Sequence, residues 1–374
     1  MRSLSIIPPL NNDAHVLGPV DIEGTVVPLG LTESERPSFA PHRLSHADHV
    51  LVRVDAFSCN YRDKSLIVES ASRMALHGWP TRDHFGSEFA GTVVAVGDSV
   101  SRWKVGDRVM ADGAYPGAAI PGIASGIVTN QASSGWVRTH QDRLAAIPHR
   151  MSTEVAAGFS LGAQTAASMI RRSGVRTGDR VLVASGRSST SLFLITALNQ
   201  LGAEVVVSST TAWSDAEKSF VAPATVISTD VDLASDVGYG STGAFDVVMD
   251  PFFDLNLARA VPLLRMWGRY VTCGMQRQHR LFEPATRPQG IEIESALLHV
   301  VINNLSIIGN CIGLSEDLSS ALETFEPERP RVPIDGLFEL EDGVAFVEGT
   351  FNARRKFGKM VMFYAQRSEA DRVP

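Results

Sequence analysis

A cluster of serines, Ser185 to Ser191, follows an apolar segment and is the stretch of this chain best suited to bind an anion. Residues 181–184 are all apolar, as expected for a strand that is buried on both faces, and residues 190–201 are typical of a helix. A tight turn between such a strand and helix binds nucleotide phosphates, because the first N–H groups of the helix point at the anion. The segment therefore predicts a phosphate site.

Two interpretations of this turn remain open, because Gly186 is its only glycine. In the first, Ser185, Ser188 and Ser189 still admit a phosphate, their hydroxyls replace some backbone contacts, and Arg187 adds a positive charge. A non-glycine residue in a left-handed conformation would cost only about 1–2 kcal/mol. In the second, the serine side chains fill the space of the phosphate and the nucleotide no longer binds.

The next predicted strand, residues 203–207, ends without an acidic residue. An NAD site usually has an Asp or Glu there, bonded to the ribose 2′-hydroxyl. Here Ser208 and Ser209 follow the strand, and Lys218 lies further on. A lysine can act as a point charge on a 2′-phosphate, so this pattern favours NADP over NAD. The alternative for Lys218 is an exposed helix lysine that is paired with Asp215 or solvated.

The order of predicted elements indicates two domains. The chain is rich in short strands up to about residue 148, and strands then alternate with helices, which is typical of a parallel sheet covered on both faces. Near the C-terminus, residues 336–340 and 358–363 again read as strands, around a short helix near 342–349. These last strands are expected to complete the first domain.

Composition excludes several classes of protein. The chain has 374 residues, a formal charge of −7, 44% hydrophobic and 20% charged residues, which fits a globular protein and argues against nucleic acid or an anionic membrane as partner. No apolar run approaches the roughly 18 residues that span a bilayer. The three cysteines are far apart and form no disulfide framework, so a cytoplasmic location is expected.

Several motifs resemble those of the medium-chain dehydrogenase/reductase superfamily over nearly the whole chain. They are residues 86–97 with the following 105–109, residues 134–138, 145–148, 162–166 and 355–362. The resemblance implies an α/β fold with two domains. These are a discontinuous GroES-like β-barrel catalytic domain, residues 1–150 and 320–374, and a Rossmann nucleotide-binding domain with a doubly wound parallel sheet, residues 151–319.

Residues 59–63, Cys-Asn-Tyr-Arg-Asp, are similar to the zinc-free quinone oxidoreductase and enoyl reductase branch. By count, the catalytic zinc ligands of the alcohol dehydrogenases fall on Asn60, on Ser87 and near Leu161. A catalytic zinc needs three protein ligands, so no metal is expected.

The resemblance assigns roles to single residues. Asn60 would donate a hydrogen bond to a substrate carbonyl, and Tyr61 would donate a proton or bond the nicotinamide ribose, or else pack between the domains. Thr165 would lie near the nicotinamide and Gly274 at the cofactor site. Asp63 is expected to cap a helix.

Four further side chains are weaker candidates for the site. Cys59 is expected to be a buried, inert thiol rather than a reactive one. His77 and His84 are weak candidates for contact with substrate, and Trp79 for an apolar wall.

The primary hypothesis is an NADPH-dependent, zinc-free reductase that delivers hydride to an α,β-unsaturated carbonyl or a quinone in an interdomain cleft. The alternative is a member that has lost its redox chemistry and catalyses elimination, cyclisation or isomerisation, or binds a small molecule. A third hypothesis is a reductase linked to an acyl carrier in secondary metabolism. A homodimer is expected, with the apolar residues 296–312 as its edge.

Overall fold

The computed structural model describes residues 1–8, 13–77, 82–116, 120, 123–228, 243–282 and 293–364, and Trp79 lies outside them. The chain forms two compact units. The first comprises Met1–Gly113, Ser125–Leu161 and Ile334–Pro374, and the second comprises Ala114–Ala124 and Gly162–Pro333. The units therefore divide at Leu161 and Ile334, rather than at residues 150 and 320, and the short segment 114–124 belongs to the second unit.

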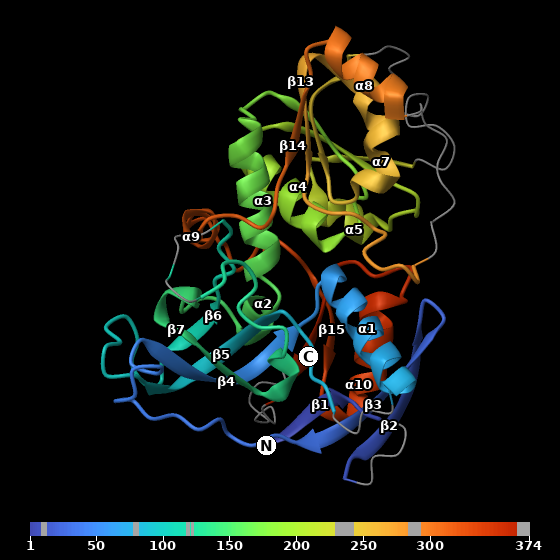
Figure 1. The fold of residues 1–374 in the computed structure, drawn as a ribbon. Coiled ribbons are helices and arrows are strands. Elements are labelled where there is room, and N and C mark those ends of the chain that lie inside the picture. Colours follow the sequence, from blue (N-terminus) through green and yellow to red (C-terminus); the bar gives the residue numbers. More distant parts are fainter. Residues whose placement is uncertain are drawn as a thin grey trace. The chain divides into compact units, whose positions relative to one another are not determined.

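The first unit contains two sheets (Figure 1). The three-stranded sheet has the order β1–β3–β2, and the larger one has the order β15–β16–β4–β5–β6–β8, with β7 paired to β4. Its strands are β1 (Arg2–Ile6), β2 (His15–Ile22), β3 (Thr25–Glu33), β4 (His49–Ser58), β5 (Glu88–Val96), β6 (Arg108–Ala111), β7 (Trp136–His140), β8 (Leu144–Ala146), β15 (Ile334–Phe338) and β16 (Lys359–Phe363). Its helices are α1 (Tyr61–His77), α2 (Thr153–Ala157) and α10 (Gly343–Phe351).

Strand β16 confirms that the C-terminal part of the chain completes the first unit. It pairs antiparallel with β4, so that Met362 lies opposite Phe57, and parallel with β15. This pairing brings the start of β16 to the end of β4. The polar residues that follow β4 and those that begin β16 therefore meet, although they are about 300 positions apart in the sequence.

The second unit is built on one parallel sheet with the order β11–β10–β9–β12–β13–β14. Its strands are β9 (Arg180–Val183), β10 (Glu204–Ser209), β11 (Thr225–Ser228), β12 (Phe245–Asp250), β13 (Leu264–Thr272) and β14 (Ser306–Gly309). Its helices are α3 (Ser160–Ser173, which begins in the first unit), α4 (Ser189–Leu201), α5 (Asp215–Val221), α7 (Phe253–Ala260), α8 (Ile293–Ile302) and α9 (Ser315–Glu323). Figure 1 shows α3 on one side of β13 and β14 and α7 on the other, which is the expected doubly wound arrangement.

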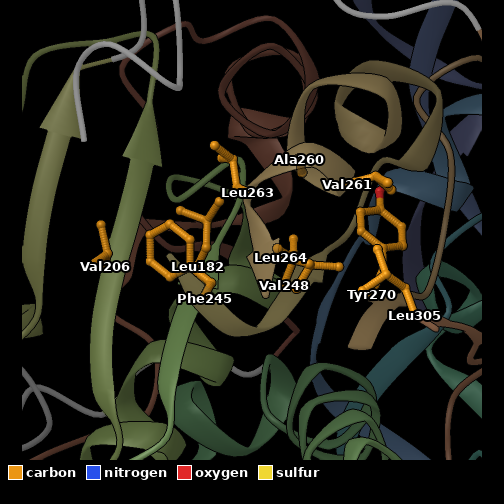
Figure 2. Close-up of a cluster of buried hydrophobic side chains, with 10 residues drawn as sticks. All are labelled: Leu182, Val206, Phe245, Val248, Ala260, Val261, Leu263, Leu264, Tyr270 and Leu305. Carbon is orange, nitrogen blue, oxygen red and sulfur yellow. The ribbon is translucent and has the colours of Figure 1, made fainter. Parts of the chain in front are cut away.

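The core of the second unit is made by the apolar runs that predicted its strands (Figure 2). Leu182 of β9, Val206 of β10 and Val248 of β12 are all at most 4% exposed. Burial of each such side chain contributes about 1.5–3 kcal/mol. Tyr270 of β13 is also fully buried, and its hydroxyl donates a hydrogen bond to Asp250 at the end of β12. The core therefore fixes the carboxyl ends of the strands, where ligands of such sheets bind.

Candidate functional site

A buried ion pair joins Lys359, the first residue of β16, to Glu88, the first residue of β5. The ammonium lies 2.8 Å from the Glu88 carboxylate, and the two side chains are 3% and 0% exposed. The other carboxylate oxygen of Glu88 accepts hydrogen bonds from the Leu161 backbone (2.8 Å) and the Ser160 hydroxyl (3.3 Å). Because charges this deeply buried are stable only when paired and hydrogen-bonded, this pair is the fixed centre of the polar cluster.

Both polar atoms of the Asn60 side-chain amide are hydrogen-bonded. Its carbonyl oxygen accepts a 2.7 Å hydrogen bond from Lys359, and its amide nitrogen donates to Ser87 Oγ and Glu88 Oε2, both at 3.2 Å. The amide has only two hydrogens to donate. A substrate carbonyl would therefore have to replace one of these two long contacts, which restricts the donor role predicted for Asn60.

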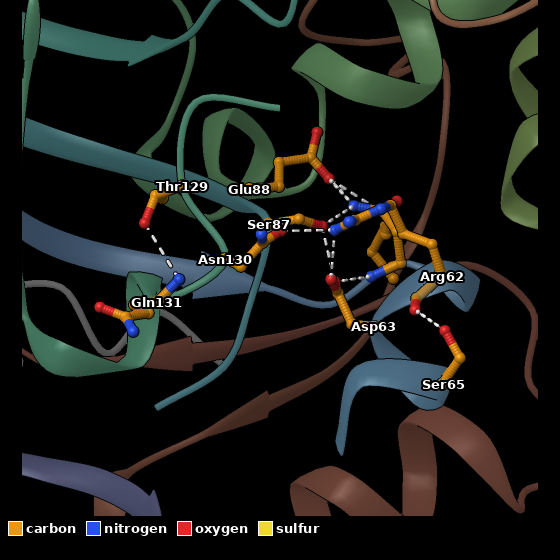
Figure 3. A network of polar contacts seen from close by, with 10 residues as sticks. Arg62, Asp63, Ser65, Ser87, Glu88, Thr129, Asn130 and Gln131 are labelled. Atoms are coloured by element: carbon orange, nitrogen blue, oxygen red, sulfur yellow. Dashed lines mark hydrogen bonds and ion pairs between the residues drawn. The ribbon is translucent and has the colours of Figure 1, made fainter. Parts of the chain in front are cut away.

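Asp63 forms the second half of the cluster, with Arg62 and Asn130 beside it (Figure 3). Its carboxylate accepts hydrogen bonds from the Asn60 backbone N–H (2.8 Å), from Ser87 Oγ (2.6 Å) and from Arg62 (3.0 Å). Burial raises the pKa of Asp63, although Arg62 opposes this shift. The bond to the backbone of Asn60 lies at the start of α1, as the cap interpretation predicts.

The zinc positions of the resemblance, Asn60, Ser87 and Leu161, all lie in this cluster. Among the described residues, no group of three or more His, Cys, Asp or Glu side chains is arranged to hold a metal ion. The positive charge here is the ammonium of Lys359, which contacts both Asn60 and Glu88. The motif 355–362 contains this lysine, but its contact with Glu88 was not predicted, because the two residues lie 271 positions apart.

The other candidates of the first unit have local roles. Tyr61 opens α1 half-buried, with the Lys64 ammonium 5.6 Å from its ring centroid. Burial raises the pKa of Cys59 well above its usual range, as expected for an inert thiol. His84 Nε2 lies 3.2 Å from the hydroxyls of Ser3 and Ser34, and burial lowers its pKa to about 4. His77 ends α1 and is exposed.

The turn between β9 and α4 has the tight geometry expected from the sequence. Ser185 is left-handed, with φ of 51°, and Ser188 is the N-cap of α4. The backbone N–H of Gly186 donates a 2.9 Å hydrogen bond to Ser208 O of β10. A Cβ at Gly186 would lie only 2.2 Å from Val207 Cγ1, so glycine is required for this close approach.

The serine hydroxyls of this turn fall into two groups. Ser191 is fully buried and donates to Ala184 O (2.9 Å), and Ser185 accepts from the Asn256 side chain (3.1 Å). These two hydroxyls stabilise the turn itself. Ser188 and Ser189 are partly exposed at the start of α4, and Ser188 makes no side-chain cap bond. The start of α4 thus retains small, partly exposed residues, which fits a phosphate.

A buried carboxylate that the sequence did not reveal lies behind the turn. Asp250 ends β12 and is 0% exposed. It accepts hydrogen bonds from Tyr270, from the Phe252 backbone (2.9 Å) and from Asn256 (2.8 Å). Burial raises its pKa. The Asn256 amide donates to both Asp250 and Ser185, so this network stabilises the left-handed conformation of the turn. An acidic residue that ends an apolar strand is the signal that would have found it.

The residues after β10 form a second charged contact at the turn. Arg187 lies 2.5 Å from Glu217 and 5.7 Å from the ring centroid of Trp213, and its side chain is 13% exposed. Lys218 points elsewhere: it is 55% exposed and 4.0 Å from Asp215. That is the solvated, paired lysine of the alternative interpretation.

Four predicted cofactor residues have roles inside the second unit. The carbonyl of Ser208 accepts from Gly186, and Ser209 Oγ donates to Thr211 O (2.9 Å) in a local turn. Gly274 follows β13, and its carbonyl accepts from the Phe253 backbone (3.1 Å). Thr165 is 8% exposed on α3.

A cavity of about 660 Å³ opens in the second unit at the carboxyl end of β14, with Ser168, Gly309 and Asn310 among its lining residues. Its volume lies within the range of small-molecule sites. Ser168 donates a 2.8 Å hydrogen bond to Asn310, one turn of α3 beyond Thr165. The cavity therefore lies at the edge of the sheet where ligands of parallel sheets bind.

Residues 46–148 match the alcohol dehydrogenase GroES-like domain family. Among curated proteins, a low-reducing polyketide synthase of Aspergillus calidoustus is 31% identical over 215 residues, which are 57% of this chain and 8% of the synthase. The chain thus spans less than a tenth of that relative's length.

Two solved structures cover almost the whole chain. A thermostable alcohol dehydrogenase from Pyrobaculum aerophilum aligns with a TM-score of 0.72 and 21% identity over 97% of this chain and 100% of that one. A quinone oxidoreductase from Coxiella burnetii aligns with a TM-score of 0.66 and 18% identity over 98% and 99%. Residues 46–148 thus belong to the alcohol dehydrogenase GroES-like domain family, and the chain as a whole shares the fold of these two enzymes.

Proposed function

We propose that the protein is a zinc-free, NADPH-dependent reductase of α,β-unsaturated carbonyl compounds, with acyl thioesters as the first substrates to test and quinones as the second. The observation that carries the proposal is the turn between β9 and α4, which keeps the close backbone approach of Gly186 and small residues at the start of the helix. The likeness to a reducing polyketide synthase supports the thioester class.

The residues of the second unit suit a dinucleotide. The N–H groups at the start of α4 and the hydroxyls of Ser188 and Ser189 would bind the pyrophosphate, since helix N-termini favour anions. No carboxylate belongs to the end of β10 itself, where Ser208 and Ser209 stand. When bound, NADPH supplies a hydride to the substrate.

In the first unit, the polar cluster would orient the substrate carbonyl. Lys359 holds the oxygen of Asn60, so the amide hydrogens face Ser87 and Glu88 in one fixed orientation. A pre-oriented donor stabilises negative charge that develops on a carbonyl oxygen without reorganisation during the reaction. With an ammonium already bonded to Asn60 and Glu88, we propose that this site works without zinc.

A second candidate function is a non-redox reaction, such as elimination or isomerisation, or binding of a small molecule without NADPH. The packing of Arg187 against Trp213 and Glu217 favours it, because these side chains already fill space beyond the end of β10. Secondary metabolism is the setting we propose for either function, on the likeness to a polyketide synthase. A reductase linked to an acyl carrier protein fits the same likeness.

Calorimetric titration with NADPH, after treatment with EDTA, tests the primary function. Binding in the micromolar range, together with oxidation of NADPH on addition of crotonyl-pantetheine, is the expected result. Absence of NADPH binding at millimolar concentration would exclude the reductase and leave the non-redox function.

The apolar edge of the second unit supports a homodimer. β14 is an end strand of the six-stranded sheet, and α8, which precedes it in the chain, exposes Leu298, Val301 and Ile302 by 59%, 73% and 63%. Exposed apolar patches of this kind mark interaction sites. We propose that a second copy covers this edge.

No helix in the described part of the chain is long and apolar enough to cross a membrane. We propose a cytoplasmic location from the low cysteine content of the sequence.

A further inference from the structure

The side chain of Arg187 reaches from one nucleotide-binding strand to the next. Arg187 lies in the turn after β9, whereas its partners Trp213 and Glu217 follow β10. The two strands are parallel neighbours, with Val183 opposite Val207. In this type of fold, the adenosine ribose lies at the end of the second strand, and an arginine nearby accommodates a 2′-phosphate.

Glu217 has two separate tasks, one for each of its carboxylate oxygens. One oxygen accepts the backbone N–H of Ser214 (2.7 Å) and completes the capping box of α5. The other accepts from Arg187 at 2.5 Å. Only the second task requires a negative charge, because a glutamine serves a capping box equally well.

We propose that Arg187 is the residue that selects for a phosphate on the ribose 2′-position. In the free protein, the carboxylate of Glu217 takes the place of this phosphate as the counter-ion of Arg187. The proposal rests on the proposed NADPH dependence. On ligand binding, the guanidinium exchanges the carboxylate of Glu217 for the 2′-phosphate and stays on the face of Trp213. An arginine suits this exchange because its planar fork binds carboxylate and phosphate with the same geometry.

The geometry favours Arg187 over Lys218 for this task. The Arg187 side chain is 13% exposed and is fixed by a ring and a carboxylate. The Lys218 side chain is 55% exposed, and its ion-pair partner Asp215 is 4.0 Å away and fully solvated. A side chain that is already ordered loses less conformational entropy on binding and discriminates better between ligands.

Calorimetry with the full-length protein tests the exchange without any measurement of turnover. The two probes are adenosine 2′,5′-bisphosphate and AMP, which differ only in the 2′-phosphate. R187Q is expected to reduce the preference for the bisphosphate by about tenfold, because a charge-assisted contact to a phosphate is lost. E217Q is expected to raise affinity for the bisphosphate by about five- to tenfold, since the internal counter-ion is removed while the cap remains.

Two variants serve as controls. D215N removes one negative charge from the same helix without touching Arg187, and its effect on the bisphosphate is expected to stay within about twofold at physiological salt. In the R187Q background, E217Q is expected to have no further effect on the preference, because the two residues act as a pair.

Each other outcome overturns a defined part of the proposal. Equal gains from E217Q for AMP and the bisphosphate would show general repulsion rather than exchange with Arg187. Loss of the preference in K218Q but not in R187Q would assign the phosphate to Lys218. Wild-type protein that binds NADPH and the bisphosphate, yet is unchanged by R187Q, overturns the inference alone. Wild-type protein that binds neither ligand overturns the proposed function and the inference with it.

Discussion

Lys359 is a buried side chain of the first unit whose ammonium has a carboxylate and an amide oxygen as partners. Its position places a fixed positive charge beside Asn60 in a fold that is shared with alcohol dehydrogenases. The same contact fixes which end of the Asn60 amide faces Ser87. One residue thus sets both the charge and the orientation of the polar cluster.

Substitution of Lys359 by methionine is expected to lower the free energy of unfolding by about 3–5 kcal/mol, because Glu88 is left buried without its partner. Urea denaturation measures this loss. The double variant E88Q/K359M is expected to recover part of it, since no unpaired charge remains. A K359M protein as stable as wild type would contradict a buried ion pair at this position.

The stability of the first unit is expected to depend on the protonation of His84. Burial and Arg82 lower its pKa to about 4, against 6.5 for an ordinary histidine, while Asp83 opposes the shift. Between these values the unfolded chain binds a proton that the folded chain does not. Stability therefore falls as the pH drops from 6.5 towards 4, by up to about 3 kcal/mol.

The difference in unfolding free energy between wild type and H84Q, measured at several pH values, isolates this effect. The other titrating groups cancel in the difference, which is expected to change steadily between pH 6.5 and 4.5 in favour of H84Q. Parallel pH profiles for the two proteins would show that His84 is not the responsible group.

At the scale of elements, β9, its turn and α4 explain why the sequence indicated a nucleotide fold despite its serines. In this turn, the backbone approaches β10 so closely at Gly186 that only glycine fits there. Ser185 takes a left-handed conformation that is stabilised by Asn256. Ser185 and Ser191 therefore stand where a hydroxyl is hydrogen-bonded, whereas glycine stands where a Cβ would collide with the next strand.

G186A is expected to destabilise the protein by about 1–3 kcal/mol, because its new Cβ would lie 2.2 Å from Val207 Cγ1 and β9 and β10 would have to separate. The matched control is G309A, since no atom lies within 4 Å of a Cβ at that position in β14. Its effect should stay within about 0.5 kcal/mol. Thermal denaturation compares the two, and equal losses would contradict the close approach at Gly186.

Prediction from sequence succeeded where the pattern is local. The apolar runs 181–184 and 203–207 correspond to β9 and β10, and the apolar residues near 342–349 correspond to α10. These elements were predictable because the pattern of buried side chains in a strand or helix repeats over neighbouring positions. The partners of Asn60, Arg187 and Asp250 were not predictable, because strand pairing and helix docking bring them together from distant positions. Lys218 stays a prediction as a phosphate ligand, and its side chain is 55% exposed and 4.0 Å from Asp215.

At the scale of the whole molecule, the chain has two units, and the second unit exposes apolar side chains of α8. Wild-type protein is expected to form a species of twice the 40.3 kDa chain mass in light scattering. V301E places a charge on the proposed interface, at a residue that is 73% exposed, and is expected to yield monomer with an unchanged circular dichroism spectrum. A wild-type monomer at micromolar concentration would exclude the homodimer.

The contact between Arg187 and Trp213 also makes the fluorescence of Trp213 a probe of ligand binding at this position. Trp213 is 6% exposed, with a guanidinium 5.7 Å from its ring centroid, whereas Trp267 is 70% exposed. The emission of an indole responds to the electric field of a nearby charge. A ligand whose phosphate replaces the Glu217 carboxylate beside the guanidinium changes this field, and is therefore expected to shift the blue, acrylamide-resistant part of the fluorescence. Ligands that bind elsewhere leave it unchanged, so that the spectrum reports the occupant of this one position.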